Sequence, residues 1–256
     1  MPNFSMRDSE NRHRSIYLLP NAFTTAALFA GFYAVVQAMN ERFEVAAIAI
    51  FVAMVLDGMD GRVARLTNTQ SAFGEQYDSL SDMTSFGVAP ALVMYEWVLN
   101  DLGRWGWLAA FVYVAGAALR LARFNINIGV VDKRFFQGLP SPAAAALVAG
   151  FVWLSVDNKL SIQNFQIAWV AFVLTMYAGI AMVTNAPFFS GKSFALGRSV
   201  PFWSILLVVA VFVFVSSDPP VVLFGLFILY GLSGWVVFAW RWQRARRLQR
   251  KRNHQS

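Results

Sequence analysis

Cysteine is absent from the 256-residue chain, and histidine occurs only twice. The absence of cysteine excludes disulfide bonds, zinc–thiolate sites, iron–sulfur clusters and a cysteine nucleophile. Both histidines, His13 and His254, lie in polar terminal segments. A metal bound within the body of the protein must therefore have oxygen ligands, which favours magnesium, manganese or calcium.

Charged residues are also scarce in this chain. They make up 14% of it, whereas hydrophobic residues make up 57% and the mean hydropathy is +0.50. Soluble domains contain about 25% charged residues. The composition therefore excludes a disordered chain, disfavours a soluble enzyme and indicates a membrane protein.

Long apolar stretches predict an all-α, polytopic transmembrane bundle of about eight spans. Pro219 and Pro220 separate the last two spans, because a proline pair cannot continue a helix. We expect a cytoplasmic N-terminal arm at 1–15, a transmembrane catalytic domain at 16–240 and a basic cytoplasmic tail at 241–256. The expected spans are 16–38, 44–66, 77–99, 105–126, 139–156, 164–185, 201–216 and 219–240.

Lysine and arginine are distributed unequally between the two sides of this bundle. With eight spans, 18 of the 21 basic residues lie on the side of the termini, and the opposite loops hold only Arg42, Arg104 and Lys159. Because basic loops remain in the cytoplasm, both termini are predicted to be cytoplasmic. The net charge of +7 is then explained by orientation and by attraction to anionic membrane lipids, and we expect no nucleic-acid partner.

Four aspartates occur where the second and third spans approach the cytoplasmic boundary. Asp57 and Asp60 are three residues apart and Asp78 and Asp82 are four apart, so each pair shares one helix face. At 1.5 Å per residue, the first pair lies roughly 20 and 24 Å along its span from Glu44. The short loop 67–76 makes the two helices antiparallel, which brings the second pair to the same depth. We therefore expect the four acids to converge.

Ionised carboxylates at this depth repel one another and are costly without a partner. Divalent cations would remove both problems, and two cations about 3.5–4 Å apart can assist phosphoryl transfer. An ion-coupled transporter and a purely structural role remain as alternatives. The intervening Gly58, Gly61 and Gly74 favour chemistry on a phosphate, because they leave room for a ligand beside the helix backbone.

The spacing of these acids resembles the motif of the CDP-alcohol phosphotransferases at every fixed position. The motif here reads Asp57-x2-Asp60-Gly61-x2-Ala64-Arg65-x8-Gly74-x3-Asp78-x3-Asp82. Flanking segments resemble the bacterial-type phosphatidylserine synthases of that family. These segments are Leu19–Asn21 with Thr24, Ser85–Pro90, Arg120–Asn125 and Phe136–Ala143.

The resemblance implies that an acceptor alcohol attacks the β-phosphorus of a CDP-linked lipid and that CMP leaves. It implies Mg²⁺ or Mn²⁺, two per site, bound by the four aspartates, with Asp82 also acting as the general base. It implies a homodimer in the bacterial inner membrane with its active site facing the cytoplasm. The implied CDP-lipid site is lined by Gly61, Ala64, Arg65 and Gly74.

Further polar residues lie on the same side of the membrane. Asn21 and Thr24 complete the six residues of the expected CDP-lipid site, as contacts to the nucleotide. The alternative for these two is an interhelical hydrogen bond and a cap. Arg120 and Arg123 either extend to lipid headgroups or hold a substrate anion, because a guanidinium pairs bidentately with a carboxylate or a phosphate. The candidate acceptor site consists of Arg120, Arg123, Asn125, Lys133 and Ser141.

The predicted function is transfer of the phosphatidyl group from CDP-diacylglycerol to the hydroxyl of L-serine, giving phosphatidylserine and CMP. Within the family, the alternative is another acceptor such as inositol phosphate, glycerol phosphate or choline. The modest number of basic residues near the acceptor site favours serine over inositol phosphate. The alternative from another class is an ion-coupled transporter, which would place acids near the membrane midplane and repeat one half of the chain in the other.

The distribution of basic residues makes a testable prediction about topology. A reporter fused after Ser256 is expected to be cytoplasmic, because the basic tail remains on that side. Reporter activity on the opposite side would contradict an even number of spans. The pair of spans predicted within 201–240 would then be the part of the topology that is wrong.

Overall fold

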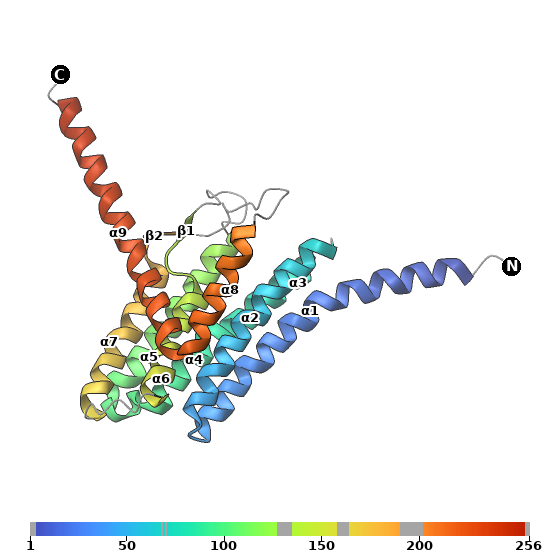
Figure 1. Ribbon diagram of the computed structural model, residues 1–256, viewed down its shortest axis with the longest axis horizontal. Helices are drawn as coiled ribbons and strands as arrows, with labels where there is room; N and C mark the ends of the chain where they lie inside the picture. The colour runs from blue at the N-terminus through green and yellow to red at the C-terminus, as the bar shows by residue number, and fades with distance from the viewer. Residues whose placement is uncertain are drawn as a thin grey trace.

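The computed structural model describes residues 4–67, 69, 71–126, 135–157, 164–189 and 202–253, and helices dominate it (Figure 1). The all-α class expected from the sequence therefore holds for the described residues, apart from two short strands. The α-helices are α1 Phe4–Met39, α2 Phe43–Thr67, α3 Ala72–Asp82, α4 Ala89–Trp97, α5 Arg104–Ile126, α6 Ser141–Asp157, α7 Asn164–Val183, α8 Phe202–Ser217 and α9 Pro219–Asn253. A π-helical segment, η1, occupies Met83–Val88 and a 3-10 turn, η2, occupies Leu99–Leu102.

Four helical segments among the described residues are long and apolar enough to cross a membrane. They are Pro20–Met39, Arg104–Ile126, Gln166–Val183 and Pro219–Trp240, and Ser141–Asp157 is apolar but shorter. Each of the eight expected spans coincides with a helix or, at 77–99, with the consecutive segments α3, η1 and α4. The number of spans that cross the membrane nevertheless stays a prediction.

The first two helices form an antiparallel hairpin whose contact surface is made of alanine. Small side chains let two helix backbones approach closely, which is the usual way helices associate without a hydrophobic driving force. The turn is short, because Arg42 and Asn40 both donate their amides to the carbonyl of Gln37. The buried alanines of the hairpin are Ala27, Ala30, Ala34 and Ala38 on α1 and Ala46, Ala47, Ala49 and Ala53 on α2.

Serine hydroxyls attach the third span to α1. Ser81 donates to the carbonyl of Thr24 at 3.1 Å, and Ser85 donates to the carbonyl of Ala27 at 3.1 Å. Gly31 lies against Ser85 so closely that an added Cβ would be 2.6 Å from its Oγ. These contacts set the position of α3 relative to α1 and α2, and Figure 1 shows the three helices side by side.

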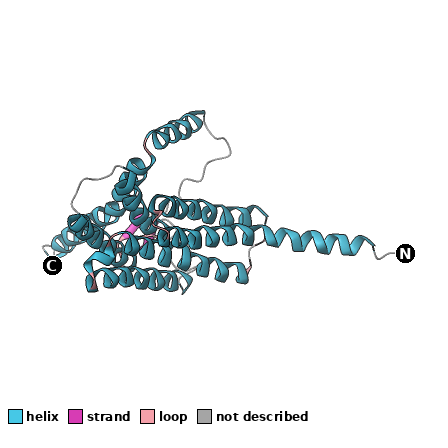
Figure 2. Cartoon of the chain, turned by 90° about the horizontal axis from the view of Figure 1, so that it is seen from below, coloured by secondary structure: helices cyan, strands magenta, loops and turns pink. Residues whose placement is uncertain are grey.

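The second half of the chain packs around α6, whose residues from Ala143 to Val152 are all buried. Helix α6 contacts α2, α4, α7 and α9, whereas α8 contacts α9. Strands β1 Phe135–Gln137 and β2 Pro187–Phe189 form an antiparallel ribbon that the sequence did not predict. Figure 2 shows this ribbon against the helices. It forms because Gly138, with φ +80°, turns the chain so that its amide meets the carbonyl of Ala186.

Both ends of the chain extend helices beyond their expected spans. The first expected span, 16–38, begins too late, because α1 begins at Phe4 and contains Pro20. A proline inside a helix removes one hydrogen bond and crowds the preceding turn, which can kink the helix without ending it. Figure 1 shows α1 turning away from the bundle towards the N-terminus, and α9 continuing through the basic residues as far as Asn253.

The contact between α5 and α7 predicts a specific sensitivity to packing. A Cβ at Gly179 would lie 2.8 Å from the Cα of Tyr113, so Gly179→Ala should destabilise the protein by about 1–3 kcal/mol through overpacking. Gly225→Ala is the matched control, because a Cβ there meets nothing within 4 Å and alanine favours a helix by about 1 kcal/mol. Thermal unfolding in detergent should show a lower midpoint for Gly179→Ala alone, and equal midpoints would contradict this packing.

Candidate active site

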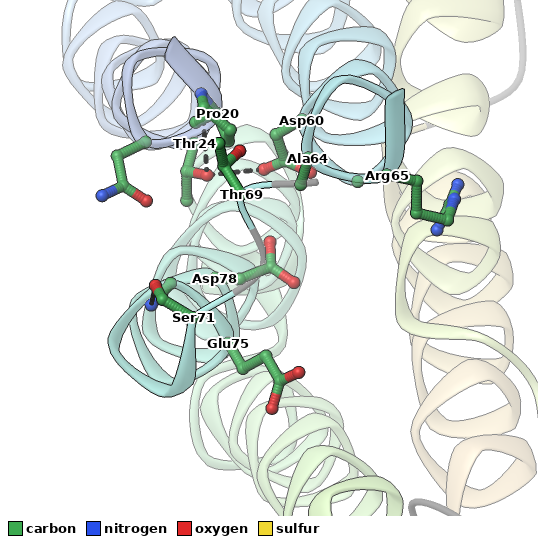
Figure 3. A pocket seen from close by; sticks show the side chains of 12 residues that line it. Pro20, Thr24, Asp60, Ala64, Arg65, Thr69, Ser71, Glu75 and Asp78 are labelled. Atoms are coloured by element: carbon green, nitrogen blue, oxygen red, sulfur yellow. Dashed lines mark hydrogen bonds between the residues drawn. The ribbon is translucent and has the colours of Figure 1, made fainter. Parts of the chain in front are cut away.

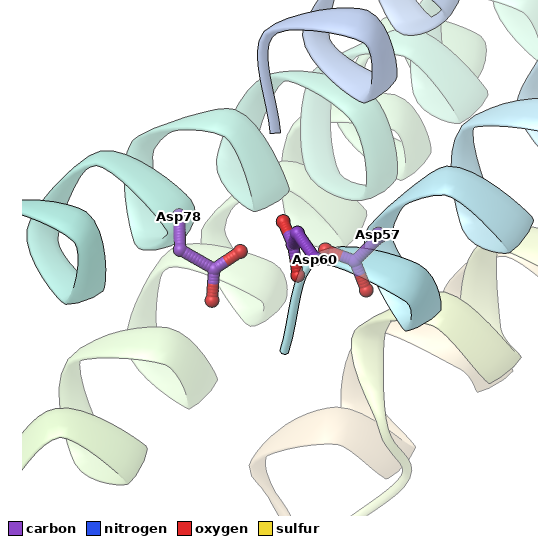
Figure 4. Close-up of side chains that lie close together, drawn as sticks. All are labelled: Asp57, Asp60 and Asp78. Carbon is purple, nitrogen blue, oxygen red and sulfur yellow. The ribbon is translucent and has the colours of Figure 1, made fainter. Parts of the chain in front are cut away.

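Three aspartates from two helices form a compact group of carboxylates. Asp57 and Asp60 lie on one face of α2, and Asp78 faces them from α3 (Figure 4). One carboxylate oxygen from each lies within 4.8 Å of the others. Asp60 is buried, and the other two are partly buried. We call Asp57, Asp60 and Asp78 the carboxylate cluster.

Helix α1 fixes one member of the carboxylate cluster directly. The hydroxyl of Thr24, which is 4% exposed, donates to Oδ2 of Asp60 at 2.6 Å (Figure 3). A hydrogen bond to a carboxylate is shorter and stronger than one between neutral groups. Of the two roles expected for Thr24, the structure therefore shows the interhelical hydrogen bond, and that bond ends on an acid of the site.

Asp82 lies one turn further along the chain than Asp78 and stands outside the carboxylate cluster. Its carboxyl group is nevertheless near enough to Asp57 and Asp78 for their charges to interact. We expected all four acids to converge at one level between two helices. The structure brings three of them into one cluster, and Asp82 follows Asp78 by four residues, about 6 Å further along the helix axis.

The chemistry of these acids fits a divalent cation. Among the described residues, Oδ1 of Asp78 and Oδ1 of Asp82 are buried and have no hydrogen-bond partner. Buried polar atoms in proteins nearly always have a partner, so two unpartnered carboxylate oxygens indicate that something else satisfies them. Hard cations prefer oxygen ligands of this type. The site can thus bind a divalent metal through Asp57, Asp60 and Asp78, with Asp82 close behind.

A pocket of about 210 Å³ opens beside the carboxylate cluster, between α1, α2 and α3 (Figure 3). All six residues that the sequence assigned to the CDP-lipid site line it, together with two members of the carboxylate cluster. The pocket is lined by Pro20, Asn21, Thr24, Asp60, Gly61, Ala64, Arg65, Thr69, Ser71, Gly74, Glu75 and Asp78.

The two glycines of the pocket leave space for different reasons. A Cβ at Gly61 would meet only the guanidinium of Arg65, at 3.6 Å, so this part of α2 is open to a ligand. A Cβ at Gly74 would lie 3.2 Å from Oγ of Ser71 and 3.4 Å from Oδ1 of Asn21. Gly74 therefore allows the start of α3 to approach α1 closely.

Sequence reasoning missed three polar residues that line the pocket: Thr69, Ser71 and Glu75. Ser71 caps α3, because its Oγ accepts the amide of Gly74 at 3.0 Å. A serine just before a helical stretch is a recognisable N-cap signal, so Ser71 could have been found. Nothing in the local sequence distinguishes Thr69, which lies in the loop before α3, or Glu75, which lies in the first turn of α3.

Arg120 is a buried basic residue whose charge reaches the acids. It is 9% exposed, extends from α5, and its charge acts on both Asp57 and Asp82. Its guanidinium donates to the hydroxyl of Ser141, which is buried at the start of α6. The structure therefore joins Arg120 to Ser141, with Arg120 near enough to Asp57 and Asp82 for their charges to interact.

The remaining candidate acceptor residues make contacts elsewhere. Arg123 donates to Oδ1 of Asn185 at 3.2 Å and to the carbonyl of Thr184, which ties α5 to the segment before β2. Asn125 and Ser79 exchange hydrogen bonds of 3.0 and 3.2 Å between α5 and α3. Lys133 lies outside the described residues. Of the five candidates, Arg120 thus acts on the acids, and Ser141 contacts Arg120.

Comparison with known proteins identifies the family. Proteins named CDP-diacylglycerol–serine O-phosphatidyltransferase are similar to this chain. The one from Helicobacter pylori strain J99 is 37% identical over 229 residues, which cover 86% of this chain and 92% of that protein. The one from Methanocaldococcus jannaschii is 43% identical over 136 residues, covering 53% and 59%. The one from Saccharomyces cerevisiae is 36% identical over 165 residues, covering 59% and 56%.

A sequence model of the CDP-alcohol phosphatidyltransferases matches residues 17–184. This stretch contains the carboxylate cluster, Asp82, the lined pocket and Arg120 with Ser141. The chain therefore belongs to the CDP-alcohol phosphatidyltransferase family.

Proposed function

We infer that this chain is an integral membrane enzyme that transfers the phosphatidyl group from CDP-diacylglycerol to the hydroxyl of L-serine and releases CMP. The observation that carries this inference is the carboxylate cluster beside a pocket lined by all six expected CDP-lipid residues. The family membership of the chain and the names of relatives that it matches over most of its length support the choice of reaction and acceptor.

The carboxylate cluster would hold two divalent cations, Mg²⁺ or Mn²⁺, with Asp82 as a further ligand. Two ions would balance the charge of four carboxylates, and magnesium completes its coordination with water and substrate phosphate. When bound, such ions supply positive charge that stabilises the pyrophosphate and the departing CMP. The unpartnered oxygens of Asp78 and Asp82 support this assignment.

Asp82 would serve as the general base for the serine hydroxyl. The oxygen of that hydroxyl attacks the β-phosphorus of CDP-diacylglycerol, its proton passes to the carboxylate of Asp82, and the bond to the CMP oxygen breaks. A base must lie within hydrogen-bonding reach of the proton it removes. The interaction of Asp82 with both Asp57 of the cluster and Arg120, the proposed acceptor residue, supports this role.

The pocket between α1, α2 and α3 would hold the cytidine diphosphate. Gly61 and Ala64 leave the face of α2 open, and Arg65 places a positive charge at the rim, where phosphate needs it. Asn21 offers an amide near Gly74 for hydrogen bonds to the nucleotide. The lipid chains of the donor would then extend into the bilayer.

Arg120 would bind the carboxylate of the incoming serine. Its guanidinium is buried beside Asp82 and Ser141, and a planar fork suits a carboxylate bidentately. One buried arginine suffices for an amino-acid carboxylate, whereas a phosphorylated acceptor would need more cations. This favours serine over inositol phosphate or glycerol phosphate.

We further propose a homodimer in the bacterial inner membrane, with the active site and both termini in the cytoplasm. The excess of basic residues on the side of the termini supports this orientation. The transporter alternative is weaker, because it calls for acids at the membrane midplane and a repeat between halves. Asp60 and Asp78 here line a pocket together with the expected CDP-lipid residues.

The test of this function is an acceptor screen with purified protein, CDP-diacylglycerol and radiolabelled acceptors. Labelled lipid is expected with serine, in equal amount to CMP, and not with glycerol phosphate or inositol phosphate. A chelator should abolish the reaction, and Mg²⁺ or Mn²⁺ should restore it. Labelled lipid from another acceptor would assign the chain to a different reaction of the family.

Substitution of the acids should separate metal binding from proton transfer. Asp60→Asn keeps the size and one acceptor but loses charge at the carboxylate cluster, so excess metal should restore part of its turnover. Asp82→Asn also removes the base, and general-base catalysis contributes about 10²–10⁴-fold. We expect Asp82→Asn to bind donor but to turn over at least about 100-fold more slowly at every metal concentration. If excess metal restored the turnover of Asp82→Asn, Asp82 would be a metal ligand and not the general base.

The two arginines of α5 should respond differently to lysine. Arg120→Lys keeps a charge but loses the bidentate fork, so the KM for serine should rise about tenfold or more, equivalent to about 1.4 kcal/mol. The KM for CDP-diacylglycerol should change little. Arg123→Lys is the matched control, because Arg123 contacts Asn185 and Thr184 and not the acids. If the two substitutions raised the KM for serine equally, Arg120 would not be part of the acceptor site.

A further inference from the structure

The helix that carries Asp78 and Asp82 does not continue as a regular α-helix. Directly after Asp82 it widens into the π-helical segment η1, where the amide of Ala89 donates to the carbonyl of Thr84, five residues earlier. It then resumes as α4. Segments of π-helix are rare and occur often at functional sites. This one belongs to a stretch, Ser85–Pro90, to which the proposed reaction gives no role.

Pro90 gives a physical reason for the widening. In a regular α-helix the carbonyl of Phe86 would accept the amide of residue 90, but Pro90 has no amide hydrogen and its ring crowds the carbonyl four residues before it. A wider turn relieves that crowding. Phe86 is fully buried, so its carbonyl needs a donor from elsewhere in the protein.

Tyr113 of α5 supplies that donor. Its hydroxyl donates to the carbonyl of Phe86 at 3.0 Å, and the side chain is completely buried. Two glycines allow the backbones around Tyr113 to approach closely. A Cβ at Gly87 would lie 3.1 Å from the Cβ of Ala117 on α5, and a Cβ at Gly179 on α7 would lie 2.8 Å from the Cα of Tyr113. Tyr113 is therefore held between α7 and η1.

The π-helical turn decides which way Asp82 faces. One extra residue in a helix of 3.6 residues per turn rotates the helix before it by about 100° relative to the helix after it. Helix α4 is fixed in the core by Val93 and Met94, both fully buried. Without the extra residue, α3 would therefore present another face to the site. Arg120 lies seven residues after Tyr113 on the same face of α5, and its charge acts on Asp82.

We propose that Tyr113 is a positioning residue for phosphatidyl transfer, whose hydroxyl fixes the π-helical turn that directs Asp82 towards the carboxylate cluster. The inference rests on the proposed function, since Asp82 is the base of that reaction. Tyr113 acts through the turn and touches neither substrate nor the reacting atoms.

The test compares Tyr113→Phe with Tyr177→Phe in the full-length protein. Both substitutions remove one tyrosine hydroxyl that donates to a backbone carbonyl, but Tyr177 bonds to Gly231 at 2.8 Å and joins α7 to α9. A displacement of about 1 Å at a catalytic group can cost about 100-fold in rate. We expect Tyr113→Phe to lower kcat about 10- to 100-fold with the KM for CDP-diacylglycerol within about twofold. Tyr177→Phe should keep kcat within about twofold.

Rates are divided by the amount of protein that binds CDP-diacylglycerol, so that loss of folded protein does not imitate loss of turnover. Pro90→Ala is the second variant, because it restores an amide at residue 90 and lets the helix regularise. It should lower kcat about tenfold or more without lowering the thermal unfolding midpoint. Wild-type kcat in either variant overturns the inference. Failure of the wild-type protein to make phosphatidylserine would instead overturn the proposed function.

Discussion

Mutual repulsion of clustered carboxylates is the constraint on which this structure depends. Asp57, Asp60 and Asp78 bring their oxygens within 4.8 Å of one another, and the charge of Asp82 acts on Asp57. Such a group is unfavourable unless positive charge compensates it. Arg120 and Arg65 supply part of that charge. The unpartnered oxygens of Asp78 and Asp82 leave room for divalent cations to supply the rest.

Two groups of helices contribute residues to the site. Helices α1, α2 and α3 surround the pocket suited to a nucleotide, and the hydrogen bond from Thr24 to Asp60 locks them together at the cluster. Arg120 of α5 and Ser141 of α6 form a second group that a hydrogen bond joins. The charges of both Asp57 and Arg120 act on Asp82. A donor held in the pocket and an acceptor held at Arg120 would therefore meet near the acids.

Periodicity and spacing were enough to predict the helical class and the pairing of the acids, and the family resemblance supplied the expected residues of the pocket. Pairs at i,i+3 and i,i+4 share a helix face whatever the tertiary structure, and the short loop between the two helices brings Asp78 to Asp57 and Asp60. The use of Arg123 and Asn125 in contacts with Asn185 and Ser79 could not be predicted, because it depends on packing between distant segments. The start of α1 at Phe4, well before the expected span, also escaped prediction, because that part of the sequence is polar and gives no apolar signal.

The most direct test of the account is a titration of the purified protein with Mn²⁺, followed by electron paramagnetic resonance. If the carboxylate cluster is a metal centre, Mn²⁺ should bind saturably in the absence of substrate. Binding of Mn²⁺ should be strongly weakened in Asp60→Asn. It should be retained in Glu75→Gln, which removes an exposed acid of the same pocket. A spin–spin interaction between bound ions would show two of them close together, as phosphoryl transfer by paired metals requires. Binding that is equally strong in wild type and Asp60→Asn would contradict the central claim that these carboxylates form a metal centre.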